Sequence, residues 1–117
     1  MAEISSRQGK RIRLFIGEAE TWQGKPLSQA LLDLAVQHRV LSATVQRGIE
    51  GFGPEHHLST ERFVEISDNL PIIVEMIDTT EHVEALLTQL DPLVQRGMMT
   101  VTSVEILQRK EQEEWEP

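Results

Sequence analysis

Hydrophobic residues recur with two different periods along this chain of 117 residues. They occupy every second position in four stretches, 11–16, 43–49, 72–77 and 98–107. This period is typical of β-strands. They occupy every third or fourth position after Pro26 and again after Asp78, which indicates two amphipathic helices. The predicted order of elements is therefore strand, helix, strand, a long loop region, strand, helix and strand.

The ends of the two helices carry residues with specific local roles. Pro26 fits the first position of a helix, because the N–H that proline lacks would have no partner there. The segment 78–81, Asp-Thr-Thr-Glu, predicts a capped helix start with a carboxylate near the positive end of the helix dipole. Gly97 fits a left-handed residue that ends the second helix.

Two other stretches predict local features of the strands and loops. In the last strand the apolar positions change from odd to even numbers after Val101, and such a change predicts a β-bulge near Thr102 and Ser103. Residues 62–66 alternate weakly and predict a short accessory strand. Between the second strand and this one, the glycines and proline of 50–57 predict an irregular loop.

The order of elements predicts an α+β fold. Two strand–helix–strand units with right-handed crossovers give a ferredoxin-like βαββαβ two-layer sandwich, an antiparallel sheet with two helices on one face. We expect this domain over residues 10–110, with a disordered N-terminal tail over 1–9 and an acidic disordered tail over 111–117.

The sheet face opposite the helices is the first candidate for an interface. It would display Phe15, Ile73 and Ile77 on adjacent strands, and a monomer rarely exposes a contiguous apolar patch of this kind. We therefore expect other subunits to cover it. The alternative is that the insertion over 58–70 folds across it.

Composition and charge exclude several classes of function. The chain has 11 Lys and Arg against 19 Asp and Glu, a net charge of −8, which repels phosphate backbones and anionic membranes. We therefore expect no nucleic-acid partner and no direct membrane insertion. The absence of cysteine excludes a disulfide framework, a thiol nucleophile and a thiolate zinc site. No apolar stretch has the length of a membrane span or signal peptide, so a cytoplasmic location is expected.

Arg47 is the most informative single residue, because it interrupts an otherwise apolar strand face. A guanidinium does not lose its charge, so an inward position requires a carboxylate, carbonyl groups or an anionic ligand. The structural interpretation is an ion pair, for which Glu75 on a neighbouring strand is a candidate. The functional interpretation is that Arg47 holds an anionic ligand.

Other residues with chemically versatile side chains have a simple structural explanation. His56 and His57 are adjacent, whereas histidine ligands of metalloenzymes usually lie three or four residues apart on a helix, so we predict no metal site. Trp22 can stack on an aromatic ligand or anchor the first loop, and anchoring is favoured. The chain has no serine-nucleophile motif and no P-loop, so no catalytic residue is predicted.

Three segments together carry a family resemblance over residues 10–109. They are 14–18 with Trp22, then 43–53, and then 67–71, Ser-Asp-Asn-Leu-Pro. In combination they resemble the PII-like family known as domain of unknown function 190, which is related to the nitrogen-regulatory PII signalling proteins. The resemblance implies a ferredoxin-like fold assembled as a homotrimer.

The resemblance also implies a regulatory rather than an enzymatic role. In the wider superfamily a small effector, here an adenine nucleotide or another small anion, binds in clefts between subunits. A loop after the second strand, here 50–60, then docks on a partner protein such as a membrane transporter or an enzyme. The implied ligand-binding residues are Arg47, Gly48, Gly51, Phe52 and Gly53, since glycine backbones can approach a ligand and donate N–H groups to phosphate oxygens.

Two other functions remain open on the residues alone. One is a small enzyme with its active site in the same cleft between subunits, in which Glu55, His57 or Asp68 transfers a proton. The other is a purely structural trimeric adaptor, in which the segment 51–53 tolerates alanine without loss of partner binding.

Overall fold

The computed structural model describes residues 3–52, 59–60 and 69–109. The elements are, in chain order, β1 (Ile4–Gly17), β2 (Thr21–Trp22), β3 (Lys25–Pro26), α1 (Leu27–Gln37), β4 (Ser42–Arg47), β5 (Glu50–Gly51), β6 (Ser59–Thr60), β7 (Pro71–Thr79), α2 (Thr80–Leu90) and β8 (Met98–Arg109). The predicted accessory strand over 62–66 and the tail over 111–117 lie outside the described residues. None of the helices in the described ranges is long and apolar enough to span a membrane.

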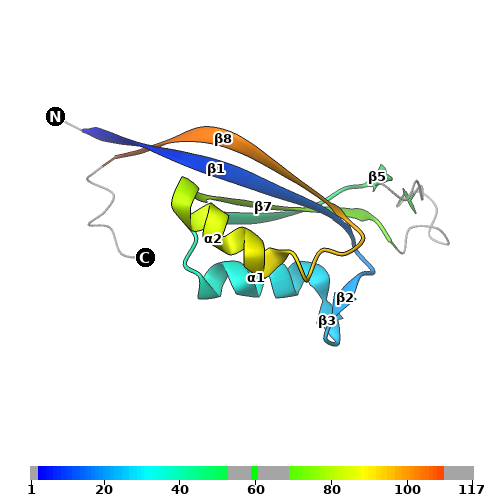
Figure 1. The fold of residues 1–117 in the computed structure, drawn as a ribbon. Helices are drawn as coiled ribbons and strands as arrows, with labels where there is room; N and C mark the ends of the chain where they lie inside the picture. Colours follow the sequence, from blue (N-terminus) through cyan, green and yellow to red (C-terminus); the bar gives the residue numbers. More distant parts are fainter. Residues whose placement is uncertain (1–2, 53–58, 61–68, 110–117) are drawn as a thin grey trace.

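The main sheet has four strands in the order β4-β7-β1-β8, and every neighbouring pair is antiparallel. Both helices lie on the same face of this sheet (Figure 1). The two-layer α+β architecture predicted from the order of elements is therefore confirmed. Two short ribbons, β2 with β3 and β5 with β6, accompany the main sheet.

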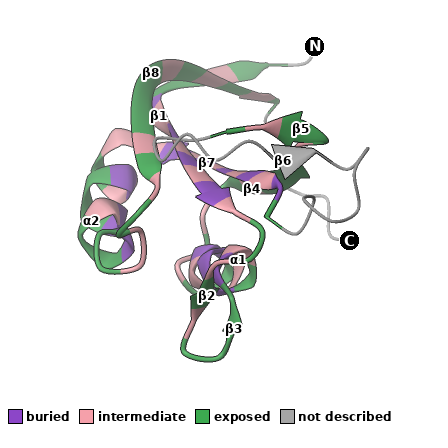
Figure 2. Ribbon diagram, turned by 90° about the vertical axis from the view of Figure 1, so that its right-hand side faces the viewer, coloured by how far each residue is buried: buried purple, intermediate pink, exposed green. Residues whose placement is uncertain are grey.

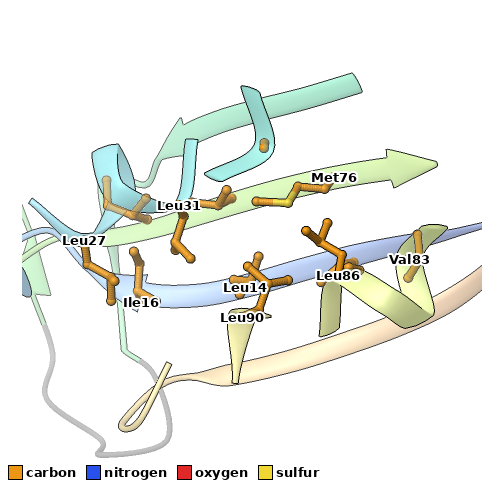
Figure 3. Packing of buried hydrophobic residues seen from close by; sticks show 12 residues of the cluster. Leu14, Ile16, Leu27, Leu31, Met76, Val83, Leu86 and Leu90 are labelled. Carbon is orange, nitrogen blue, oxygen red and sulfur yellow. The ribbon is translucent and has the colours of Figure 1, made fainter. Parts of the chain in front are cut away.

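The hydrophobic core lies between the sheet and the two helices (Figure 3). Alternate residues of the two central strands are buried there, and they are Ile12, Leu14, Ile16, Ile72, Val74 and Met76. The helices contribute buried residues at helical spacing, among them Leu27, Leu31, Val83, Leu86 and Leu90. Figure 2 shows buried positions on both helices and on the central strands β1 and β7, whereas β8 has none. Burial of one such side chain stabilises the fold by roughly 1.5–3 kcal/mol.

The opposite face of the sheet is half-buried and mixed in character. Phe15 lies directly opposite Ile73 in the β1–β7 register, as the predicted patch requires. Between these apolar positions and Ile77, however, Arg13 donates to Glu75 across the strands, with Nε and Oε2 2.9 Å apart. The patch on this face is therefore smaller than the alternation alone predicts, because an ion pair divides it.

The first strand is longer than the sequence predicts. Residues 4–9, expected in a disordered tail over 1–9, form the first part of β1 and pair with the last part of β8. A Cβ at Gly9 would overlap with the Ile106 side chain and the Asp78 carbonyl oxygen, so the strands pack closely there. The sequence does not reveal this part of the strand, because residues 4–8 are mostly polar and none of them is buried.

The predicted bulge in the last strand is wrong. The β1–β8 register runs without interruption from Ile4 opposite Arg109 to Phe15 opposite Met98. The apolar positions change from odd to even numbers because the two halves of the strand use opposite faces for packing. Val101 lies on the helix side, whereas Ile106 lies on the other side and packs over Gly9.

The two helices start close to where the sequence predicts, but α2 ends at Leu90 rather than at Gly97, so the predicted end of the second helix is wrong. Pro26 is the residue before α1 rather than its first residue, and Thr79 precedes α2 without making a side-chain capping bond. Gly97 does not have a positive φ. A Cβ there would instead overlap with the Phe15 carbonyl oxygen, so the glycine is needed for close approach to β1.

Asp78 is the one buried charged residue in the part of the chain that the structure describes. Its Oδ1 accepts from the N–H of Thr79 at 2.7 Å, and its Oδ2 accepts from the N–H of Leu41 at 3.2 Å. His82 lies 2.6 Å from the same Oδ2 through its Nδ1. The carboxylate therefore joins the end of β7, the start of α2 and the segment before β4.

Candidate functional site

The candidate site lies at one end of the sheet. Because neighbouring strands are antiparallel, the ends of β1 and β4 and the starts of β7 and β8 meet there. Figure 1 shows β5 and the β2–β3 hairpin at the same end of the molecule. We call this region the loop end of the sheet, and the end with Asp78 the opposite end.

Arg47 is the last residue of β4 and forms an ion pair at the loop end. Its Nε donates to Oε2 of Glu18 at 2.7 Å. The two side chains are 48% and 37% exposed, so the guanidinium is not buried and can also meet a ligand from solvent. The predicted ion pair between Arg47 and Glu75 is wrong, because the Glu75 carboxylate accepts from Arg13 instead.

The turn after β1 holds Glu18 in place. The N–H of Glu18 donates to the Leu70 carbonyl oxygen at 2.8 Å, and the N–H of Ala19 donates to Oδ1 of Asn69 at 2.9 Å. Glu20 accepts from the N–H of Gly17 with its Oε2, at 2.5 Å. The turn is thus fixed to the segment before β7, and the carboxylate that faces Arg47 has a defined position.

Two of these residues have no functional signal in the sequence. Glu18 follows a strand at the start of a loop, and nothing in its neighbours indicates a partner. An Asn side chain such as that of Asn69 commonly bonds to nearby backbone in a turn, but here it bonds to a turn 50 positions away.

Glycines allow the segment after β4 to run close to Pro71. The N–H of Gly48 donates to the Pro71 carbonyl oxygen at 2.7 Å, and a Cβ at Gly48 would lie 2.8 Å from Cγ of the proline ring. Gly51 has a φ of +157°, which favours glycine, and a Cβ there would lie 3.3 Å from the same Cγ. The structure therefore brings Gly48 and Gly51 together with Arg47.

The remaining predicted residues are divided between the described and the undescribed parts of the chain. Phe52 is 59% exposed next to Gly51, whereas Gly53 lies outside the described residues. His56 and His57, discussed above for metal binding, also lie outside them, as do Glu55 and Asp68. Within the described ranges no three His, Cys, Asp or Glu residues are grouped as metal ligands would be.

Trp22 lies on β2 and is partly buried against the core cluster. This placement supports the interpretation that it anchors the loop between β1 and α1.

The loop end has the chemistry of an anion site. A half-exposed guanidinium offers a planar pair of N–H donors that matches a carboxylate or phosphate. The neighbouring carboxylate of Glu18 already contacts this guanidinium. An incoming anion would therefore compete with Glu18 for Arg47 rather than fill an empty charged site.

A comparison with known protein families shows which family the chain belongs to. The family described as DUF190, Uncharacterized ACR, matches residues 9–106. The chain belongs to the DUF190 family. The resemblance seen in the three sequence segments is thereby confirmed.

Related proteins match this DUF190 chain over almost their whole length. A UPF0166 protein of Aquifex aeolicus (strain VF5) is 31% identical over 98 residues, which cover 84% of this chain and 92% of the relative. A UPF0166 protein of Methanocaldococcus jannaschii is 23% identical over 100 residues, covering 85% and 92%.

Solved structures of PII-like proteins share the fold of this DUF190 chain. CPII from Thiomonas intermedia K12, a nitrogen regulatory PII-like protein bound to ADP, AMP and bicarbonate, superposes with a TM-score of 0.64 at 17% identity. That match covers 87% of this chain and 91% of CPII. A putative PII-like signaling protein from Thermus thermophilus gives a TM-score of 0.56 at 14% identity, covering 92% and 96%. These likenesses establish the ferredoxin-like, PII-like fold.

Proposed function

We propose that this protein is a trimeric PII-like regulator that binds an adenine nucleotide or another small anion at the loop end of the sheet. The observation that carries the proposal is the half-exposed guanidinium of Arg47 beside the glycine segment that leaves β4. Arg47 holds the anionic group, and the backbone of Gly48 and Gly51 leaves room for the rest of the ligand. Phe52 and Gly53 complete the ligand-binding segment.

The solved relatives support the choice of ligand. CPII is bound to ADP, AMP and bicarbonate in one structure and to ADP, AMP and acetate in another. All of these are anions, and each presents a phosphate or carboxylate-like group that suits a guanidinium. An apo form of CPII has a similar likeness to this chain, with a TM-score of 0.60.

The response to the ligand follows from the competition at Arg47. When an anion takes the guanidinium from Glu18, the contacts that hold the start of the 50–60 loop change. A ligand shifts a loop only by its different affinity for the two loop states, and the exchange of Glu18 for the ligand supplies such a difference. The changed loop then docks on a partner protein.

In this proposal the site lies between subunits. The open sheet face carries Phe15 and Ile73 opposite each other, and burial of this patch favours association. An Ile73→Glu variant is expected to sediment as a monomer, whereas Val36→Glu, at a position on α1 that is 70% exposed, keeps the trimer. A wild-type protein that sediments as a monomer would contradict this part of the proposal.

Titration calorimetry tests the ligand. We expect heat on addition of ADP, AMP, ATP or bicarbonate to the wild-type protein, and Arg47→Ala should weaken binding about tenfold or more, as the loss of a charge-assisted contact implies. Arg109→Ala is the matched control, because it removes the same charge at the opposite end of the sheet. Equal affinity of the Arg47→Ala variant and the wild type would exclude Arg47 from the site.

The same samples distinguish a regulator from a small enzyme in the cleft. A regulator returns the nucleotide unchanged, so chromatography after incubation should recover the ADP that was added. Turnover that disappears in His57→Ala or Glu55→Ala would favour the enzyme. A structural adaptor would give no heat with any of these anions.

A further inference from the structure

A polar pocket of about 410 Å³ lies beside the loop end, between the turn after β1 and the α2–β8 connection. Its volume is within the range of pockets that hold small molecules. The lining residues are Ala19, Glu20, Thr21, Trp22, Leu27, Asn69, Leu93, Gln95 and Arg96. None of the residues proposed above for the nucleotide lines it, so the pocket is separate from the Arg47 site.

The pocket contains a positive and a negative group from different segments. Arg96, on the α2–β8 connection, has no carboxylate within ion-pair distance among the residues that the structure describes. Glu20, on the turn after β1, uses Oε2 to accept from the N–H of Gly17. Its Oε1 accepts from no donor in the described ranges. The pocket thus offers one cation and one anion to a ligand.

The rest of the wall is suited to a small side chain. Trp22 is partly buried against the core, Leu27 is 2% exposed, and Leu93 packs on the core cluster. The amides of Asn69 and Gln95 complete the lining. The side-chain oxygen of Asn69 already accepts from the N–H of Ala19, and within the described ranges its amide hydrogens have no acceptor.

From this arrangement we infer that the pocket binds a free α-amino acid. The α-carboxylate accepts from the planar N–H groups of Arg96. The α-ammonium donates to Oε1 of Glu20, and the side chain lies against Trp22 and Leu93.

Ligand-observed NMR and titration calorimetry with each of the 20 common amino acids test the inference on the full-length protein. At least one is expected to bind. The corresponding amine without the carboxylate, and the corresponding acid without the amino group, should each bind about tenfold more weakly, because one charged contact is lost in each. Failure of every amino acid to bind the wild type overturns the inference, as does equal binding of the amino acid and both analogues.

Variants locate the binding. Arg96→Gln should weaken amino-acid binding about tenfold, and Arg96→Lys should do so by less, since it keeps the charge but loses the planar fork. Arg109→Gln is the matched control and should leave the affinity unchanged. Both positions are exposed, so thermal melting should show that all three variants are folded. An unchanged affinity of Arg96→Gln overturns the inference, and so does loss of ADP binding in this variant without any amino-acid binding, which would assign the pocket to the nucleotide.

Discussion

The two ends of the sheet are held together in different ways. At the loop end most connections join backbone groups, from Gly48 to the carbonyl of Pro71 and from Glu18 to the carbonyl of Leu70, and the Asn69 side chain adds one more. At the opposite end a single buried carboxylate, that of Asp78, accepts from the N–H groups of Leu41 and Thr79 and contacts His82.

Because of this difference, the opposite end mainly supports the stability of the fold, whereas the loop end offers charged side chains for binding. The side chain of Asp78 is 6% exposed, and its hydrogen bonds hold the fold. At the loop end the backbone holds the segments, and the charged side chains of Arg47 and Glu18 remain near solvent. These two charged side chains can exchange partners without loss of the backbone hydrogen bonds that connect the segments.

The largest expected effect is at the opposite end. Asp78→Ala leaves the N–H groups of Leu41 and Thr79 without this acceptor and should lower the free energy of unfolding by about 3 kcal/mol. His82→Ala removes only one of the contacts and should cost about 1 kcal/mol. Urea unfolding measures both, with the exposed Asp91→Ala as control. A loss below that of the His82 variant would show that the carboxylate does not hold this end.

The next largest effect concerns the close approach of strands near the loop end. Gly97→Ala places a Cβ against the carbonyl oxygen of Phe15, which is backbone, and should destabilise by about 2 kcal/mol. Gly48→Ala meets the ring of Pro71, a side chain that can shift, so it should cost about half as much. Thermal unfolding of the two variants gives the ratio, and equal losses would contradict the distinction between backbone and side-chain neighbours.

Binding should change at the loop end where stability does not. Glu18→Ala removes one internal competitor for Arg47 and should strengthen nucleotide binding about threefold, while the exposed pair contributes less than about 1 kcal/mol to stability. Calorimetry and urea unfolding on the same variant separate the two quantities. Weaker nucleotide binding by Glu18→Ala would indicate that the carboxylate contacts the ligand rather than competing with it.

The smallest effect comes from an exposed pair between β3 and α1. Hydrogen bonds from Lys25 and Gln29 hold the pKa of Asp33 below its usual value of 3.8. A lowered pKa means that the contribution to stability is complete above about pH 3.8 and is lost as the pH falls toward the folded-state pKa. The melting temperatures of wild type and Asp33→Asn should therefore differ slightly at pH 6 and converge toward pH 3. A difference independent of pH would contradict this.

The central part of the fold could be predicted because buried positions in strands and helices carry apolar residues at regular spacing. In β7 the residues facing the helices are buried and those on the other face are half-buried, so the strand is apolar on both faces and easy to detect. None of residues 4–8 is buried, and no periodicity distinguishes them from a tail. The sequence also does not show that β8 is regular. Ile106 packs against Gly9, a residue far away in the sequence, and the alternation within β8 carries no sign of this contact.

The candidate site could be predicted only in part for a related reason. Arg47 stands out because it interrupts an apolar alternation, but alternation does not give its partner. Glu75 lies opposite Thr44 and Arg13 in the two registers, so it is on the other face of the sheet from Arg47. Glu18 comes into contact through a turn whose position depends on the segment 69–70. The pocket around Arg96 is built from distant segments and has no local signature.

The position of β1 in the sheet determines when the domain can complete its fold during synthesis. This strand is made before the other elements, yet both of its neighbours, β7 and β8, come from the second half of the chain. On the ribosome, the apolar side of β1 has no sheet partner until β7 has been synthesised; it carries Ile12, Leu14 and Ile16. One edge of the strand then stays unpaired until β8 follows. Pairings between residues so far apart in sequence form slowly. The apolar side of β1 therefore stays accessible to chaperones, and to other nascent chains, until translation of the domain is nearly finished.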